Sequence, residues 1–267
     1  MRSPTAGGGE RRKRAVSERR RDPPREYASP PCYLHELEEP TKAVRRAAEP
    51  AGAAQPARAA APAAPPSDTN PPPDPAQRAD VMRWRKAERA RLIGERLAMP
   101  SRTRRSLGER IAHRLEEAIG DPAGLMVSTY APFRGEPGMS ALIESVLARG
   151  GRHALPVVIE RGRPLVFRAW SPGEPLERGI WNIPQPPASA AVVLPDVIIS
   201  PVVGFDRKGY RLGYGGGFYD RTLASMPKRP RVFGVGYAAA AIATIYPQTH
   251  DIPMTAIVTE DGILERR

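Results

Sequence analysis

Short apolar segments alternate with helix-forming segments along residues 81–267, and this alternation is the feature that most restricts the fold. The run VIISPVV at 197–203 is continuously apolar, as expected for a parallel strand covered on both faces. The other strand-like runs lie at 125–130, 153–158, 164–170, 231–237 and 256–260. The pattern predicts an α/β protein with a three-layer, doubly wound, mostly parallel sheet of the Rossmann-like kind.

The intervening segments have helical spacing. Residues 81–99 consist of good helix formers and end before Pro100, and Ser101 is the expected cap of a second helix at 101–119. In that second segment, apolar residues recur about every four positions and so share one face. Further helices are predicted at 140–149, 218–225 and 238–246.

Residues 1–80 have a different composition. They hold nearly half of the 32 prolines, contain no Trp or Phe, and are almost free of Val, Ile and Leu. Such a segment cannot bury enough apolar surface to offset the entropy of ordering the chain, so we expect a disordered extension before a single domain at 81–267. Within it, the segment YASPPCYLHELEE at 27–39 is either a docking peptide or a marginal helical turn without a role.

Cysteine content and charge exclude several classes of protein. The only cysteine, Cys32, rules out an internal disulfide framework and a multi-cysteine metal site. No apolar run approaches the roughly 18 residues of a membrane span, and no secretory signal is evident, so a cytoplasmic protein without a membrane partner is expected. The net charge of +12 includes a basic block at 11–25, which could contact nucleic acid non-specifically. No recognised nucleic-acid-binding motif accompanies it.

The segment GFDRKGYRLGYGGGFYDR at 204–221 follows the most apolar strand and begins a helix. Ligands bind at that end of a strand in open α/β sheets. Its glycines allow the backbone to approach an anion closely, while the helix dipole and Arg211 supply positive charge. These glycines are Gly213, Gly215, Gly216 and Gly217. The spacing predicts a phosphate-binding loop that matches neither of the two standard nucleotide motifs.

Two acidic residues are candidate metal ligands. Asp220 falls in the first turn of the helix after the glycines, where a carboxylate would repel phosphate unless a cation lay between them. Mg²⁺ is therefore expected there, although the residue could instead only complement the helix dipole. Asp251 is a second candidate, with capping of the turn before Pro253 as the alternative.

Three motifs occurring in this order resemble the 5-formyltetrahydrofolate cyclo-ligase family, also called methenyltetrahydrofolate synthetase. They are RGE at 134–136, WNIPQP at 181–186 and RLGYGGGFYDR at 211–221. The resemblance extends from about Trp84 to the C-terminus. It implies a ligase of one-carbon metabolism that converts 5-formyltetrahydrofolate and ATP to 5,10-methenyltetrahydrofolate, ADP and phosphate, with Mg²⁺ as the metal. We expect a monomer.

The chemistry that this resemblance implies needs no covalent nucleophile from the protein. A formamide oxygen is a poor leaving group, so transfer of the γ-phosphoryl group to that oxygen lets N10 close the ring and expel phosphate. The work of the protein is then positioning and charge neutralisation. This agrees with the absence of a catalytic Cys or Ser/His/Asp set from the sequence.

The resemblance also assigns site residues position by position. It places ATP at Arg85, Arg89, Arg211, Leu212, Gly213, Tyr214, Gly215, Gly216, Gly217, Phe218 and Tyr219. It places the folate at Ala131, Glu136, Trp181 and Tyr214, and the metal at Asp220 and Asp251. Arg85 and Arg89 lie four residues apart, so both can reach one polyanion. A merely solvated basic face is the alternative, because Arg91 and Arg96 are near them in sequence.

Two positions depart from the family pattern. Tyr214 and Gly216 stand where some relatives carry Arg and Lys, so one cationic contact is either missing or supplied elsewhere, for example by Lys208. Two other functions remain open from the sequence. One is a non-catalytic nucleotide- or anion-binding module with a nucleic-acid-contacting basic arm. The other is a sugar-phosphate isomerase or CoA-transferase-like enzyme, for which Glu136 is the one candidate base.

Overall fold

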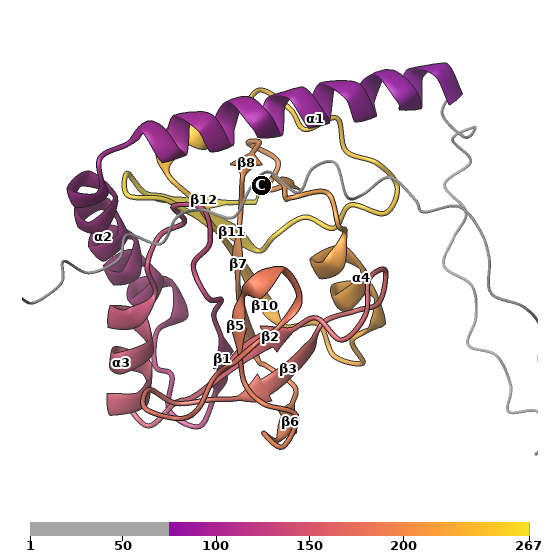
Figure 1. The fold of residues 1–267 in the computed structure, drawn as a ribbon. Helices are drawn as coiled ribbons and strands as arrows, with labels where there is room; N and C mark the ends of the chain where they lie inside the picture. The colour runs from indigo at the N-terminus through magenta and orange to yellow at the C-terminus, as the bar shows by residue number, and fades with distance from the viewer. Residues whose placement is uncertain (1–74, 267) are drawn as a thin grey trace, which may run out of the picture. The chain divides into compact units, whose positions relative to one another are not determined.

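The structure is a computed structural model in which residues 75–266 are described (Figure 1). The basic block at 11–25, Cys32 and the peptide at 27–39 lie outside the described residues, so the expectations about them stay predictions. Among residues 75–266, no helix is both long and apolar enough to cross a membrane.

The centre of the fold is an eight-stranded sheet with the order β12-β11-β10-β7-β1-β2-β3-β6. The inner strands β2, β1, β7, β10 and β11 are parallel to one another, whereas β3, β6 and β12 pair antiparallel at the two edges. The strands are β1 (Met126–Ser128), β2 (Arg152–Val157), β3 (Val166–Ala169), β6 (Val192–Val193), β7 (Val197–Pro201), β10 (Arg231–Val235), β11 (Ala256–Val258) and β12 (Ile263–Glu265). The predicted α/β fold with a mostly parallel sheet is confirmed.

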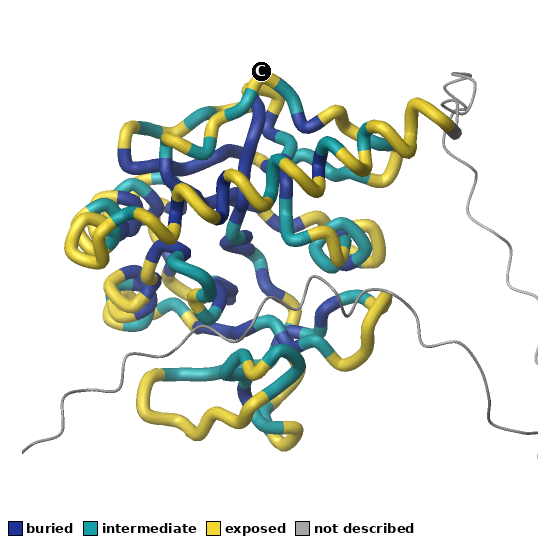
Figure 2. The backbone as a smooth tube through the Cα atoms, turned by 45° about the horizontal axis from the view of Figure 1, so that its top comes forward, coloured by how far each residue is buried: buried dark blue, intermediate teal, exposed yellow. Residues whose placement is uncertain are grey.

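Helices lie on both faces of this sheet. On one face, α2 (Ser101–Ile119) and α3 (Ser140–Ala148) bury their apolar residues against alternate side chains of β1, β7, β10 and β11. On the other face, α4 (Phe218–Ser225) packs through Leu223 against the remaining side chains, including Ile198 and Val232. Figure 2 shows the buried strands between helices whose outer surfaces are exposed.

The first helix, α1 (Pro75–Ala98), has another role. It runs along one end of the sheet rather than over a face (Figure 1). Its buried Leu92 and Ile93 pack against Val203, Leu212 and Ile245, which belong to segments that follow the strands. The helix therefore covers the carboxyl end of the central strands, and its side chains can reach the loops there.

The smaller elements shape this end of the sheet. Two ribbons form, β4 (Glu177–Arg178) with β5 (Pro184–Gln185) and β8 (Gly204–Phe205) with β9 (Arg211–Leu212). The described residues also form two 3₁₀ turns, η2 (Ile180–Asn182) and η3 (Ala238–Ala240). The sequence pattern did not predict these ribbons or the edge strand β12.

Three local predictions differ from the structure. Helix α1 begins at Pro75, ahead of the predicted start at residue 81. Pro100 occupies the N-cap position of α2 and Ser101 is its first residue, without a side-chain cap. The predicted helix at 238–246 is wrong, because it stops after the 3₁₀ turn η3.

The structure also explains why that last helix does not form. The amide of Ile242 donates to the carbonyl of Phe205, and the amide of Ile245 donates to Asp206 Oδ2. These hydrogen bonds hold the segment beside the β8–β9 ribbon in an extended course. Tertiary contacts thus override the helical propensity of the alanines.

The strand order indicates where a ligand should bind. From β1, the chain moves to β2 on one side of the sheet, and from β7 it continues to β10 and β11 on the other side. The order therefore reverses between β1 and β7, and ligands of doubly wound sheets bind at the carboxyl ends of the strands beside such a reversal. The loops that leave these two strands carry the RGE and glycine-rich motifs.

Candidate functional site

The glycine-rich loop joins β9 to α4 and has the backbone geometry of an anion cradle. Gly215 has a φ of +98°, and Gly217, with a φ of +61°, occupies the N-cap position of α4 in the left-handed region. Among the described residues, no acceptor takes the backbone N–H groups of residues 214–219. Free amides at a helix N-terminus favour an anionic ligand.

Arg89 is a cation that lies at this loop. Its Nε donates to the carbonyl of Gly213 at 2.6 Å, and a Cβ at Gly215 would lie 3.5 Å from its guanidinium carbon. In the described part of the chain, no carboxylate lies within ion-pair distance of Arg89. Burial and the neighbouring charge of Arg85 lower the pKa of Arg89 to about 10, so it remains a cation at neutral pH. Arg89 is therefore a cation at the glycine loop that no carboxylate of the described residues neutralises, and Arg221, whose guanidinium donates to the carbonyl of Gly216, is another.

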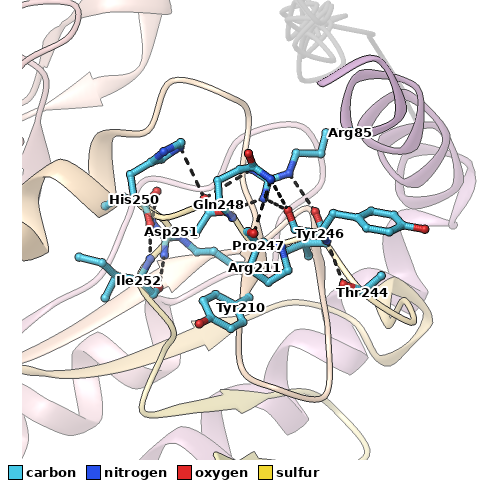
Figure 3. Close-up of polar contacts among 12 residues, drawn as sticks. Arg85, Tyr210, Arg211, Thr244, Tyr246, Pro247, Gln248, His250, Asp251 and Ile252 are labelled. Atoms are coloured by element: carbon cyan, nitrogen blue, oxygen red, sulfur yellow. Dashed lines mark hydrogen bonds and ion pairs between the residues drawn. The ribbon is translucent and has the colours of Figure 1, made fainter. Parts of the chain in front are cut away.

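Arg85, predicted to act with Arg89, is held differently. It is 5% exposed, and its terminal nitrogen lies 2.5 Å from Asp251 Oδ2. It also donates to the carbonyls of Ile245 and Tyr246, at 2.9 Å and 2.8 Å. Figure 3 shows Arg85 reaching from α1 into the 244–252 segment. In this structure the residue clamps that segment to α1.

Arg211 forms a second buried ion pair. Its guanidinium lies 3.0 Å from Asp220 Oδ2 and donates to the carbonyl of Ile252 at 3.2 Å. The other carboxylate oxygen of Asp220 accepts the amide of Ile252 at 3.0 Å. Asp251 precedes Ile252 in the chain, so the two predicted metal ligands are connected through the amide of Ile252, and each forms an ion pair with one of the two arginines.

The donor chemistry of these aspartates suits Mg²⁺, which prefers carboxylate oxygens and usually takes its remaining ligands from water and substrate phosphates. No group of three or more His, Cys, Asp and Glu side chains gathers among the described residues. The described residues thus offer two carboxylates, Asp220 and Asp251, rather than a complete metal cage. Their assignment as metal ligands stays a prediction.

On the other side of the loop, Tyr214 contacts Glu136. The Tyr214 hydroxyl donates to Glu136 Oε1 at 2.9 Å, and the amide of Phe133 donates to Oε2 at 2.9 Å. Glu136 is 7% exposed, and this burial raises its pKa to about 7. The RGE and glycine-rich motifs, predicted to act together, are therefore in direct contact.

Sequence reasoning missed Arg96, which it grouped with the solvated face of α1. Arg96 is 7% exposed and donates to the Tyr214 hydroxyl at 2.6 Å. Lys208, the suggested replacement cation, is exposed in the turn between β8 and β9. Spacing could have identified Arg96, because it lies seven residues after Arg89 and thus about 20° from it around an ideal helix. Arg91 lies on the exposed side and pairs with Glu88 and Glu95.

Trp181 lies beside the start of α4. Its ring centroid is 5.6 Å from that of Phe218, in an edge-to-face arrangement. The φ values of Trp181 and Asn182, both +59°, are unusual for residues with a side chain. Strained backbone of this kind is common in ligand-binding sites. Trp181 of the WNIPQP motif thus contacts the residue that follows the glycine loop, and its role as a wall of the folate pocket stays a prediction.

The other predicted residues fall in the same region. Ala131 follows β1, Leu212 is buried under α1, and Tyr219 stacks on the guanidinium of Arg211 at 5.5 Å. Asp206, by contrast, accepts three backbone amides and maintains the β8–β9 turn.

The comparisons with known proteins all point to the same family. Residues 81–260 match the model of the 5-formyltetrahydrofolate cyclo-ligase family. A 5-formyltetrahydrofolate cyclo-ligase of Escherichia coli K12 is 33% identical over 178 residues, which cover 64% of this chain and 97% of that protein. One from Mycolicibacterium smegmatis is 34% identical over 178 residues, covering 61% and 92%.

Solved structures agree. The NMR structure of Aquifex aeolicus 5,10-methenyltetrahydrofolate synthetase superposes with a TM-score of 0.60 at 28% identity, covering 68% of this chain and 93% of that one. A 5,10-methenyltetrahydrofolate synthetase from Mycoplasma pneumoniae, at 20% identity and a TM-score of 0.56, shares the fold and covers 66% and 98%. With the family model matching most of the chain, the protein belongs to the 5-formyltetrahydrofolate cyclo-ligase family.

Proposed function

We propose that the protein converts 5-formyltetrahydrofolate to 5,10-methenyltetrahydrofolate with consumption of ATP. The observation that supports this most directly is the meeting of three features at the carboxyl ends of β1 and β7. They are the free amides of the glycine loop, the unpaired cation Arg89 and the buried acid Glu136. The first two suit a polyphosphate, and the third suits a ring that presents N–H donors.

In this proposal, the triphosphate binds along residues 213–219, where Arg89 and the amides neutralise its charge. Arg211 and Arg85 contribute after they exchange Asp220 and Asp251 for phosphate oxygens. The two aspartates would then hold Mg²⁺, which supplies further charge neutralisation on the phosphates when bound. Electrostatic stabilisation and positioning of this kind are the main contributions of a protein to phosphoryl transfer.

The folate binds on the other side of the loop. Glu136 accepts hydrogen bonds from the pterin ring, and the rings of Trp181 and Tyr214 form the pocket wall beside it. Ala131 lies at the start of the same loop as Glu136. The formyl oxygen then faces the γ-phosphate, receives the phosphoryl group and leaves as phosphate when N10 closes the ring.

The direct test is spectroscopic. Purified protein with 5-formyltetrahydrofolate and Mg-ATP should produce the absorbance of the methenyl chromophore, together with one ADP for each ring closed. Omission of ATP is the control. ATP binding without turnover would instead favour a non-catalytic nucleotide-binding module, and turnover of a sugar phosphate would favour an isomerase.

Removal of residues 1–74 should leave turnover and the melting temperature unchanged, because every proposed site residue lies on the described part of the chain. The truncation should end at residue 74 rather than 80, since α1 begins at Pro75. Activity and thermal melting of the two truncated proteins are compared with those of the full chain. A large loss on deletion of 1–74 alone would contradict the prediction.

A further inference from the structure

Arg96 is a buried cation without a carboxylate partner at ion-pair distance among the described residues. Its three hydrogen bonds reach the carbonyl of Arg134 at 2.9 Å, the carbonyl of Val202 at 3.3 Å and the hydroxyl of Tyr214 at 2.6 Å. These acceptors belong to the loop after β1, the segment after β7 and the glycine loop. A single guanidinium on α1 therefore connects the three segments that form the proposed site.

The hydrogen bond to Tyr214 has a fixed direction. A guanidinium has only donors, so the Tyr214 oxygen must accept from Arg96. The single hydroxyl proton of Tyr214 is then directed to Glu136 Oε1, 2.9 Å away. Glu136 Oε2 accepts from the amide of Phe133. Both carboxylate oxygens of Glu136 therefore act as acceptors, which is the arrangement of an ionised carboxylate.

We propose that Arg96 is a positioning residue that acts through Tyr214 to keep Glu136 an ionised hydrogen-bond acceptor for the reduced folate. This rests on the proposed function, because it assigns Glu136 to the folate. Arg96 would thereby supply, from α1, a positive charge at a loop position where some relatives carry Arg and this chain carries Tyr214.

The surroundings of Glu136 make this contribution necessary. Burial alone disfavours the charged form and raises the pKa of Glu136 to about 7, while Arg96, the Phe133 amide and Tyr214 all act in the opposite direction. Other groups whose charge interacts with that of Glu136 are phenols, which stay neutral because their own pKa values are raised. They are Tyr130, Tyr219 and Tyr237. Arg96 is thus the cation that favours ionisation of Glu136.

The first test needs no substrate. The carboxyl carbon of Glu136 is followed by ¹³C NMR across pH, with its signal assigned by its absence from Glu136→Gln. The midpoint should lie near pH 7 in the wild type and rise by roughly one unit or more in Arg96→Leu, because a nearby opposite charge lowers a carboxyl pKa by that amount. Arg96→Lys keeps the charge and should restore most of the shift. Arg91→Leu, on the exposed side of the same helix, should leave it unchanged.

The second test uses turnover. In Arg96→Leu, the KM for reduced folate should rise about fivefold at pH 7, and this ratio should fall toward one as the pH rises above the shifted midpoint. The value of kcat should change little. A purely structural role would raise KM by the same factor at every pH.

The two proposals fail in different ways. If the wild type neither binds nor converts the folate, the proposed function is wrong, whatever the NMR midpoints are. If the wild type is active but Arg96→Leu has the wild-type midpoint and a pH-independent KM ratio, the role of Arg96 is wrong. Tyr214→Phe should raise the midpoint in the same direction, and combined with Arg96→Leu it should add less than the sum of the single effects.

Discussion

Replacement of Asp220 by alanine should nearly abolish turnover, with a loss of about 100- to 1,000-fold, the range seen when an electrostatic group is removed from a transition state. The carboxylate faces Arg211 at 3.0 Å and lies beside Asp251 through the amide of Ile252. In the proposed function it holds the Mg²⁺ that accompanies ATP. Its loss removes both a metal ligand and the residue that keeps Arg211 in place.

The same substitution should also lower the stability of the fold, and this effect must be distinguished from the loss of catalysis. Arg211 is 8% exposed, and a buried charge left without its partner destabilises a protein by about 3–5 kcal/mol. The double variant Asp220→Ala with Arg211→Met removes both charges and should recover much of the melting temperature without recovering turnover. Asp261→Asn, at an exposed carboxylate, is the control for a simple loss of charge.

Measurements of nucleotide binding then test whether Asp220 acts through a bound metal ion. Calorimetry of ATP binding with and without Mg²⁺ should show that the ion strengthens binding to the wild type but not to Asp220→Ala. An Asp220→Ala protein that keeps full activity, or the full effect of Mg²⁺ on ATP affinity, would remove Asp220 from the metal site.

Local sequence patterns predicted the elements that carry the site. The buried strand β7, the glycine loop and α4 follow one another in the chain, and α4 has the predicted bounds Phe218–Ser225. A continuous apolar run, glycines in the left-handed region and a helix start are all features that neighbouring residues decide. Tertiary contacts, by contrast, determine the backbone conformation of residues 238–246, so the predicted helix there was wrong.

The sequence alone could not predict which side chains of the site contact one another. Arg85 and Asp251 are 166 positions apart, and Tyr214 and Glu136 are 78 apart. Which side chains meet depends on the reversal of strand order between β1 and β7 and on the course of α1 over that end of the sheet. Arg96 shows the consequence, because its helical spacing matches Arg89 but only the packed structure reveals Tyr214 beside it.

Two buried groups, His153 and Glu136, should have opposite effects on how stability depends on pH. Their combined contribution to the free energy of unfolding should therefore change little between about pH 4.5 and 6.5. His153 is 3% exposed, and burial lowers its pKa to about 4 from an ordinary value of 6.5. The unfolded chain then binds more protons than the native protein, so His153 makes stability fall as the pH falls. Glu136, with its pKa raised to about 7 from 4.5, makes stability fall as the pH rises.

Single substitutions should reveal how each group makes the free energy of unfolding depend on pH. In Glu136→Gln the contribution of His153 remains, and it should increase the free energy of unfolding of this variant by about 3 kcal/mol between pH 4 and 6.5. In His153→Gln the contribution of Glu136 remains, and the free energy should decrease by about the same amount between pH 4.5 and 7. Urea unfolding at a series of pH values measures both.

The two variants also test the hydrogen bonds that position these groups. His153 Nδ1 lies 2.9 Å from the carbonyl of Trp170, which can only accept, so the proton is on Nδ1 and Nε2 accepts from the Thr129 hydroxyl at 2.8 Å. Burial disfavours the charged imidazolium that a second ring proton would create, which is why acid should destabilise the fold through this residue. The double variant should lack both contributions and match the wild-type profile in shape. A Glu136→Gln profile as flat as that of the wild type would mean that Glu136 titrates near its ordinary pKa, and would also remove the need for Arg96 to keep it ionised.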